Sequence, residues 1–212
     1  MTSPNSLFNE ESGNHPLPTD EREIAAVLCA ALRCHEEHPY FSERYGERGE
    51  AFIRSDGGYL ATLADHPQSY VNDQVTWLAG VLANRGMPRW PMEAHLDFLC
   101  DELNAAVPAR APDYLKLRHA AQLLREQRQA RIAQADFDAL VAAFESASGG
   151  CLKGAGGLVV AAVCDECCGL PEAVPSLIGW LSDPDRFPPQ WCAAVTDTLA
   201  RASAVADQKR GG

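Results

Sequence analysis

Two short segments hold the residue types that could bind a metal ion or carry redox chemistry. The first, Cys34-His35-Glu36-Glu37-His38, offers thiol, imidazole and carboxylate groups, which are the donors that transition metals use in proteins. The second, Cys164-Asp165-Glu166-Cys167-Cys168, contains the Cys-x-x-Cys spacing of zinc and redox sites. Together they predict a candidate metal or redox cluster with the ligands His35, His38, Cys164, Cys167 and Cys168, and with a transition metal as its possible cofactor.

A simpler structural interpretation of both segments is the one we favour. The histidines can lie at a solvated helix end, where the helix dipole favours positive charge and where Pro39 disturbs the helix. The three cysteines of the second segment share a helical face with Val160 and Val163, which is typical of a buried apolar stripe. Neither a second Cys-x-x-Cys pair nor the βαβ context of a thioredoxin-like site occurs in the chain.

Other groups of polar residues carry weaker signals. The glycine-rich segment 149–157 could cradle an anion at a helix N-terminus, but it lacks the Ser or Thr of a phosphate-binding loop. The acids and the histidine that follow Trp90 do not form the Glu-x-x-His pairs of a di-iron bundle. No motif specifies a reaction, so the sequence favours a protein that is not an enzyme.

A repeated pattern suggests that the chain arose by internal duplication. Trp77-Leu78 corresponds to Trp180-Leu181, and Pro88-Arg89-Trp90 corresponds to Pro189-Gln190-Trp191. All four tryptophans of the chain fall on this pattern. We therefore expect two similar helical halves with the tryptophans at equivalent, buried places.

The charge of the chain is distributed unevenly. The net charge is −11, and residues 1–108 hold 17 acidic and 7 basic side chains, whereas residues 109–132 hold 2 acidic and 6 basic ones. This balance argues against a nucleic-acid-binding protein, which needs cations to neutralise phosphates. The basic helix should instead face acidic groups of the chain or of a partner. We take as candidate ligand- or partner-binding residues Trp77, Trp90, His95, Arg118, Arg125, Trp180 and Trp191.

A stretch of about 20 residues, from Tyr70 to Trp90, resembles the distal part of bacterial globin-coupled sensors. Tyr70, Trp77, Pro88 and Trp90 stand at compatible spacing. Val81 occupies the place of the haem-ligating histidine, so the resemblance implies at most a haem-less sensor domain. The internal duplication also explains the Pro-x-Trp element, because that element occurs twice.

Apolar periodicity predicts helices along almost the whole chain. We expect Gly57-Gly58 to end a helix and the segment 149–157 to form a flexible loop. The valine-rich segment 158–168 suits a strand as well as a helix, but no second strand is available to pair with it. The expected fold is an all-α bundle of about eight to ten helices, predicted at residues 20–36, 39–56, 58–65, 68–84, from 88 onward, 112–132, 135–147, 158–168, 171–183 and 188–206.

The predicted domain organisation has four parts. A flexible N-terminal tail covers residues 1–19, two helical halves cover 20–111 and 112–206 and pack as one compact domain, and a disordered tail covers 207–212. The N-terminus lacks a basic start and an apolar run, which indicates a cytoplasmic protein without a membrane partner.

The favoured function is a non-enzymatic α-helical binding or regulatory protein. Its site would lie between the halves, where a shared cleft could take a protein partner or a small ligand. A homodimer is possible. The alternatives are a metal- or redox-dependent protein that uses the cysteine and histidine cluster, and the haem-less globin-type sensor domain.

Overall fold

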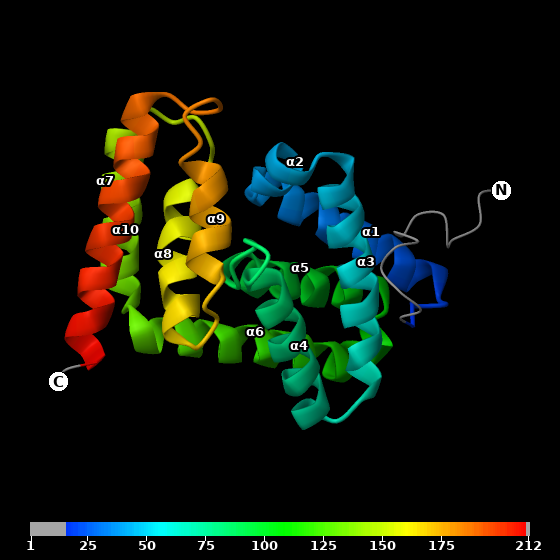
Figure 1. Ribbon diagram of the computed structural model, residues 1–212. Helices are drawn as coiled ribbons and strands as arrows, with labels where there is room; N and C mark the ends of the chain where they lie inside the picture. Colours follow the sequence, from blue (N-terminus) through cyan, green and yellow to red (C-terminus); the bar gives the residue numbers. More distant parts are fainter. Residues whose placement is uncertain (1–15, 211–212) are drawn as a thin grey trace. The chain divides into compact units, whose positions relative to one another are not determined.

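The computed structural model describes residues 16–210, and this part of the chain contains ten α-helices and no strand. The all-α prediction is confirmed, and the helix count lies within the predicted range. No helix in this range is both long and apolar enough to cross a bilayer. The helices are α1 (Glu21–Glu37), α2 (Tyr40–Tyr45), α3 (Glu47–Thr62), α4 (Gln68–Ala83), α5 (Trp90–Ala106), α6 (Ala111–Arg131), α7 (Gln134–Ser148), α8 (Ala155–Cys167), α9 (Ala173–Leu181) and α10 (Pro189–Arg210) (Figure 1).

The chain divides into two compact units. Unit 1 comprises Met1–Thr76 and Pro91–Leu123, and unit 2 comprises Trp77–Trp90 and Leu124–Gly212. The division falls inside α4 and α6, so neither helix belongs wholly to one unit. The internal duplication stays a prediction.

Unit 1 is built around the packing of α1 on α3. Asp20 begins α1 because its carboxylate accepts a hydrogen bond from the Arg22 backbone N–H, which satisfies one donor of the first turn. The buried face of α1 includes Val27 and Ala30, both fully inaccessible to solvent. Pro39 starts the short helix α2 after α1 has ended at Glu37, as its fixed φ favours at a helix start.

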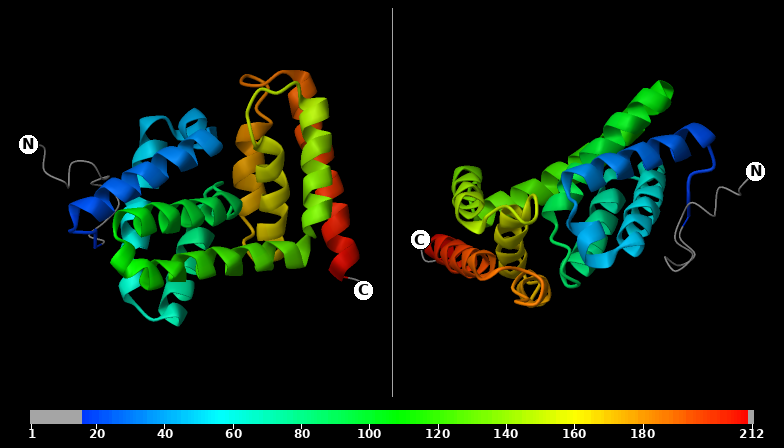
Figure 2. Two further views of the ribbon diagram at one scale, coloured as in Figure 1. Left: turned by 180° about the vertical axis from the view of Figure 1, so that it is seen from behind. Right: turned by 90° about the horizontal axis from the view of Figure 1, so that it is seen from above.

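Unit 2 contains a group of packed helices in which α7, α8 and α10 contact one another and α9 contacts α8 (Figures 1 and 2). The buried core cluster contains Ile132, Phe137, Leu140, Val160, Ala161, Val163, Cys164, Ala202 and Ala206. The end of α4 is tied to α9, because the Asn84 carbonyl accepts a hydrogen bond from the Ser176 hydroxyl at 3.0 Å. The valine-rich segment is therefore a helix, and its valines belong to this core.

The expectation that Gly57-Gly58 ends a helix is wrong, because both residues lie inside α3. Glycine is needed there for close packing rather than for a turn. A Cβ atom at Gly57 would lie 3.0 Å from Nε2 of His95 and 3.3 Å from Cγ1 of Val27. The missing side chain thus lets α5 and α1 approach α3 closely.

The predicted loop over residues 149–157 is shorter than expected. Gly149, Gly150 and Gly154 adopt positive φ angles, which end α7 and precede α8. Helix α8 already begins at Ala155, so the last two glycines of the segment are helical and buried. At Gly157 a Cβ atom would lie only 2.4 Å from the Trp90 ring, so this glycine also serves close packing.

Both predicted tails extend beyond the described residues. Most of the predicted N-terminal tail, residues 1–15, lies outside them, and so do residues 211–212. At the other end α10 continues to Arg210, past the predicted helix end at residue 206. The prediction of a disordered segment from residue 207 is therefore wrong as far as Arg210.

Candidate functional site

The two histidines proposed as metal ligands occupy different environments at the end of α1. His35 is half-buried and lines a hollow on unit 1, whereas the buried His38 caps the helix with its backbone N–H donating to the Cys34 carbonyl at 2.9 Å. Burial raises the pKa of the Cys34 thiol to about 12, so this thiol is protonated at neutral pH. The two histidines therefore differ in their access to solvent.

The three cysteines proposed as ligands lie at the C-terminal end of α8. Cys164 is fully buried, and burial raises the pKa of its thiol to about 12. Cys167 and Cys168 are half-buried. Within residues 16–210 no three His, Cys, Asp or Glu side chains are grouped so that they could hold a metal ion. Metal binding stays a prediction that this arrangement does not support.

The four tryptophans differ in their surroundings. Trp191 is fully buried, and its indole N–H donates to the Leu181 carbonyl at 2.9 Å. Trp90 is half-buried, with its ring 5.5 Å from that of Phe137, and Trp180 is half-buried beside Phe187. Trp77 is 52% exposed, so the expectation that all four are buried is wrong for this residue.

The basic helix α6 pairs with acidic groups inside unit 1. Arg118 forms ion pairs with Asp97, at 3.6 Å, and with Asp101, both on α5. Arg125 lies further along α6 and is half-buried. The charge of Arg118 is therefore largely matched within the chain, which leaves less of it to attract a partner.

His95 is buried rather than placed at a binding surface. Neither of its ring nitrogen atoms has a hydrogen-bond partner. Burial, with a smaller contribution from the charge of His38, lowers the pKa of His95 to about 4. His95 is therefore neutral at physiological pH and acts as part of the packing between α5 and α3.

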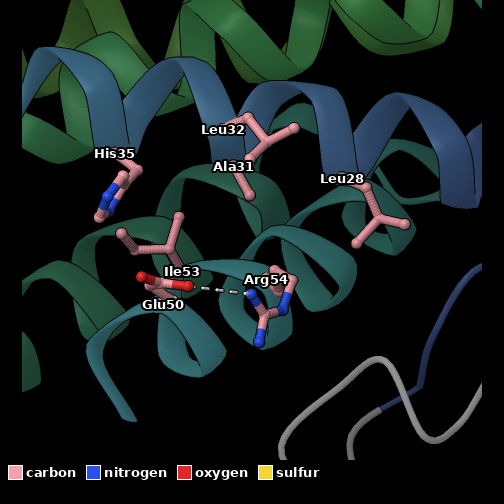
Figure 3. A pocket seen from close by; sticks show the side chains of 7 residues that line it. All are labelled: Leu28, Ala31, Leu32, His35, Glu50, Ile53 and Arg54. Carbon is pink, nitrogen blue, oxygen red and sulfur yellow. Dashed lines mark ion pairs between the residues drawn. The ribbon is translucent and has the colours of Figure 1, made fainter. Parts of the chain in front are cut away.

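Unit 1 contains an open hollow between α1 and α3 (Figure 3). It encloses about 250 Å³. Helix α1 contributes Leu28, Ala31, Leu32 and His35, and α3 contributes Glu50, Ile53 and Arg54. Leu32 lies at the edge of the hollow and its side chain is 63% exposed. Such exposure is unusual for a large apolar residue on a helix face that packs against another helix.

The lining of the hollow combines an apolar surface with a few polar groups. The side chains of Leu28, Ala31 and Ile53 point from the two helices toward one another (Figure 3). The polar groups are the ion pair between Glu50 and Arg54, at 3.8 Å, and the ring of His35. Nδ1 of His35 is buried and has no hydrogen-bond partner. An apolar surface with one unused polar atom can bind an apolar molecule and orient it.

Of the residues around the hollow, only His35 was a candidate in the sequence, and there as a metal ligand. The signal that could have indicated the others is the width of the apolar stripe on α1. Leu28 and Leu32 lie four residues apart, at the edge of the stripe rather than in its centre. Which edge of a stripe stays uncovered depends on the helix that packs against it, and the sequence does not specify this.

Comparison of the chain with protein-family models, with curated proteins and with solved structures finds no match.

Proposed function

We propose that the protein is a non-enzymatic binding protein that takes a small, mostly apolar molecule into the hollow between α1 and α3. The observation that carries this proposal is the buried Nδ1 of His35, which lacks a partner beside an apolar surface that solvent can reach. A buried polar atom without a partner costs free energy, and a ligand that bonds to it removes that cost. The ligand therefore has an apolar body and one hydrogen-bonding group.

The size of the hollow supports a small ligand. Its volume of about 250 Å³ lies just below the roughly 300–1,000 Å³ of typical drug-sized ligand pockets. A one- or two-ring molecule matches this space better than a large cofactor does. The exposed side chain of Leu32 gives such a ligand further apolar contact at the edge.

The polar groups around the hollow support binding rather than catalysis. The carboxylate of Glu50 faces the guanidinium of Arg54, so each charge already has a counterpart. General acid–base catalysis needs a group whose proton affinity suits transfer at the working pH, together with a second group that positions it. The single imidazole of His35 next to an apolar surface is better suited to hold a ligand than to drive a reaction.

A pair of matched probes tests this proposal. 1-Naphthol carries a hydroxyl group that can donate to His35 Nδ1 or accept from it, whereas 1-methylnaphthalene has nearly the same shape without that group. Each probe is titrated into the protein and followed by NMR shifts of the backbone amides. We expect shifts concentrated around Leu32 and Ile53, with 1-naphthol binding about tenfold tighter, which corresponds to about 1.4 kcal/mol.

Three variants complete the test. His35→Phe should abolish the preference for 1-naphthol, because it keeps the ring and removes the polar atom. Leu32→Asp should weaken both probes at least tenfold. Leu115→Asp is the control, since Leu115 is also exposed in unit 1, at 40%, and does not line the hollow. Equal losses in Leu32→Asp and Leu115→Asp, or shifts scattered over the protein, would contradict the proposal.

A further inference from the structure

The outward face of α1 carries apolar side chains at a regular spacing. Ala25, Cys29 and Leu32 are all exposed, and the exposed residues Arg22 and Glu36 continue the same series in the two directions. Exposed positions therefore recur after three and then four residues along the helix. This is the spacing by which one helix packs lengthwise against another. We call these five residues the α1 seam.

Helix α1 is anchored in unit 1 through its other side. Val27, Ala31 and Cys34 are buried, and α1 packs on α3. Within residues 16–210 no element buries the seam, although three of its five members are apolar. Exposed apolar side chains that gather on one face indicate an interaction surface. The α1 seam is therefore a candidate docking surface for another helix.

The charges at the two ends of the seam are opposite and lie symmetrically about Cys29. Arg22 precedes Cys29 by seven residues, and Glu36 follows it by seven. The side chain of Arg22 is 64% exposed, and Asp20 accepts hydrogen bonds only from its Nε and Nη2 atoms. Two antiparallel copies of α1 that meet at Cys29 would place each Arg22 beside Glu36 of the other copy. Parallel copies would bring like charges together, which opposes association.

We propose that two copies of this protein dock through their α1 seams, antiparallel about a two-fold axis near Cys29. Such a contact is isologous, so one surface serves both copies. On each side of the axis the small side chain of Ala25 lies opposite the larger Leu32, which lets the two helices interdigitate. A second copy fits this face because the seam is complementary to itself in both size and charge.

The length of α1 sets the strength that we expect. A helix of 17 residues is about 25 Å long, so a contact confined to it is smaller than the roughly 1,200–2,000 Å² of a stable interface. The dimer should therefore be weak and dissociate on dilution. The inference goes beyond the proposed ligand binding, because no ligand takes part in this contact.

Sedimentation equilibrium of the reduced, ligand-free protein over a range of concentrations tests the proposal. We expect the mass to rise with concentration from 22.9 kDa toward twice that value. Ala25→Glu should weaken association at least about tenfold, because it places a carboxylate inside an apolar contact. Ala142→Glu is the matched control, since Ala142 is an exposed helical alanine on α7. A monomer at every concentration, or equal association in the two variants, would overturn the proposal.

Reversal of the charges tests the antiparallel arrangement. Arg22→Glu should weaken association, because an acidic group then faces Glu36 of the other copy. Adding Glu36→Arg should restore it, since the pair is re-formed with its charges exchanged. Residues 22 and 36 lie about 21 Å apart along one helix, so restoration has to come from a contact between copies. Association that stays weak in the double variant, with an unchanged circular dichroism spectrum, would overturn the proposal.

Cross-linking of cysteines locates the two-fold axis. A short bis-maleimide should join two copies through Cys29, so Cys29→Ser should abolish the covalent dimer. Cys151→Ser is the control, because Cys151 is the other exposed cysteine among the described residues. A covalent dimer that is lost only in Cys151→Ser would overturn the proposal. No probe of the hollow is present in these experiments, so their failure would leave the proposed ligand binding untouched.

Discussion

The environment of a single imidazole decides what it can do in this chain. His35 keeps one buried nitrogen beside a hollow that solvent can reach, whereas His95 is buried against Gly57 with both nitrogens unpartnered. The first arrangement can hold a ligand, and the second can only be maintained while the ring is neutral. The two residues are alike in the sequence and differ only in what covers them.

The protonation of His95 should make stability depend on pH. Its pKa falls from 6.5 in the ordinary state to about 4 in the folded protein, so between these values the unfolded chain binds a proton that the folded chain does not. Stability is therefore lost as the pH falls from 6.5 to 4, by roughly 3 kcal/mol from this group. Urea unfolding at several pH values measures the slope.

Two leucine variants isolate that contribution. His95→Leu should remove the slope that this ring contributes, because leucine does not titrate. His66→Leu is the control, since His66 is exposed and should leave the slope unchanged. An identical pH dependence in His95→Leu and the unmodified protein would show that burial of this ring does not drive the effect.

Close approach between helices depends on glycines inside α3 and α8, at positions where the sequence pattern predicts a helix end or a loop. Gly57 in α3 admits His95, and Gly157 in α8 admits the ring of Trp90. Glycine in a helix costs about 1 kcal/mol relative to alanine, so its presence inside a helix needs a packing reason. Here the reason is that each glycine contacts a ring contributed by a distant part of the chain.

Replacing these glycines tests the packing argument. Gly157→Ala should destabilise unit 2 by about 1–3 kcal/mol, because a methyl group 2.4 Å from the Trp90 ring forces the ring or the helix to move. Gly179→Ala in α9 should instead stabilise the protein by up to about 1 kcal/mol, since nothing lies within 4 Å of the added methyl group. Urea unfolding measures the change in the free energy of unfolding for both variants. Destabilisation of equal size in both would contradict the packing argument.

At the scale of the whole molecule, this acidic chain contains ion pairs of two kinds, buried and exposed. Arg89 and Asp165 form a buried pair between residues 76 positions apart, whereas Arg118 and Asp101 form an exposed pair, with Asp101 48% accessible. Exposed pairs are screened by water and contribute little. A buried pair leaves an uncompensated charge when one partner is removed. Net charge therefore says little about which acidic residues matter for stability.

The same substitution at both sites should separate the two kinds of pair. Asp165→Asn should cost about 3–5 kcal/mol, because the guanidinium of Arg89 stays buried without its counter-ion. Asp101→Asn should cost less than about 1 kcal/mol. Thermal and urea unfolding measure both effects. A small loss in Asp165→Asn would show that the amide and neighbouring groups replace the carboxylate fully.

The sequence by itself determined the helical class and most helix positions. These depend on apolar periodicity, prolines and glycines acting on near neighbours along the chain. Only the tertiary structure decided that Gly57 lies inside a helix, that Trp77 is exposed and that Arg89 forms a buried ion pair with Asp165. Burial and ion pairing depend on contacts between residues far apart in the chain. The pattern of near neighbours does not specify which distant side chain will contact a given residue.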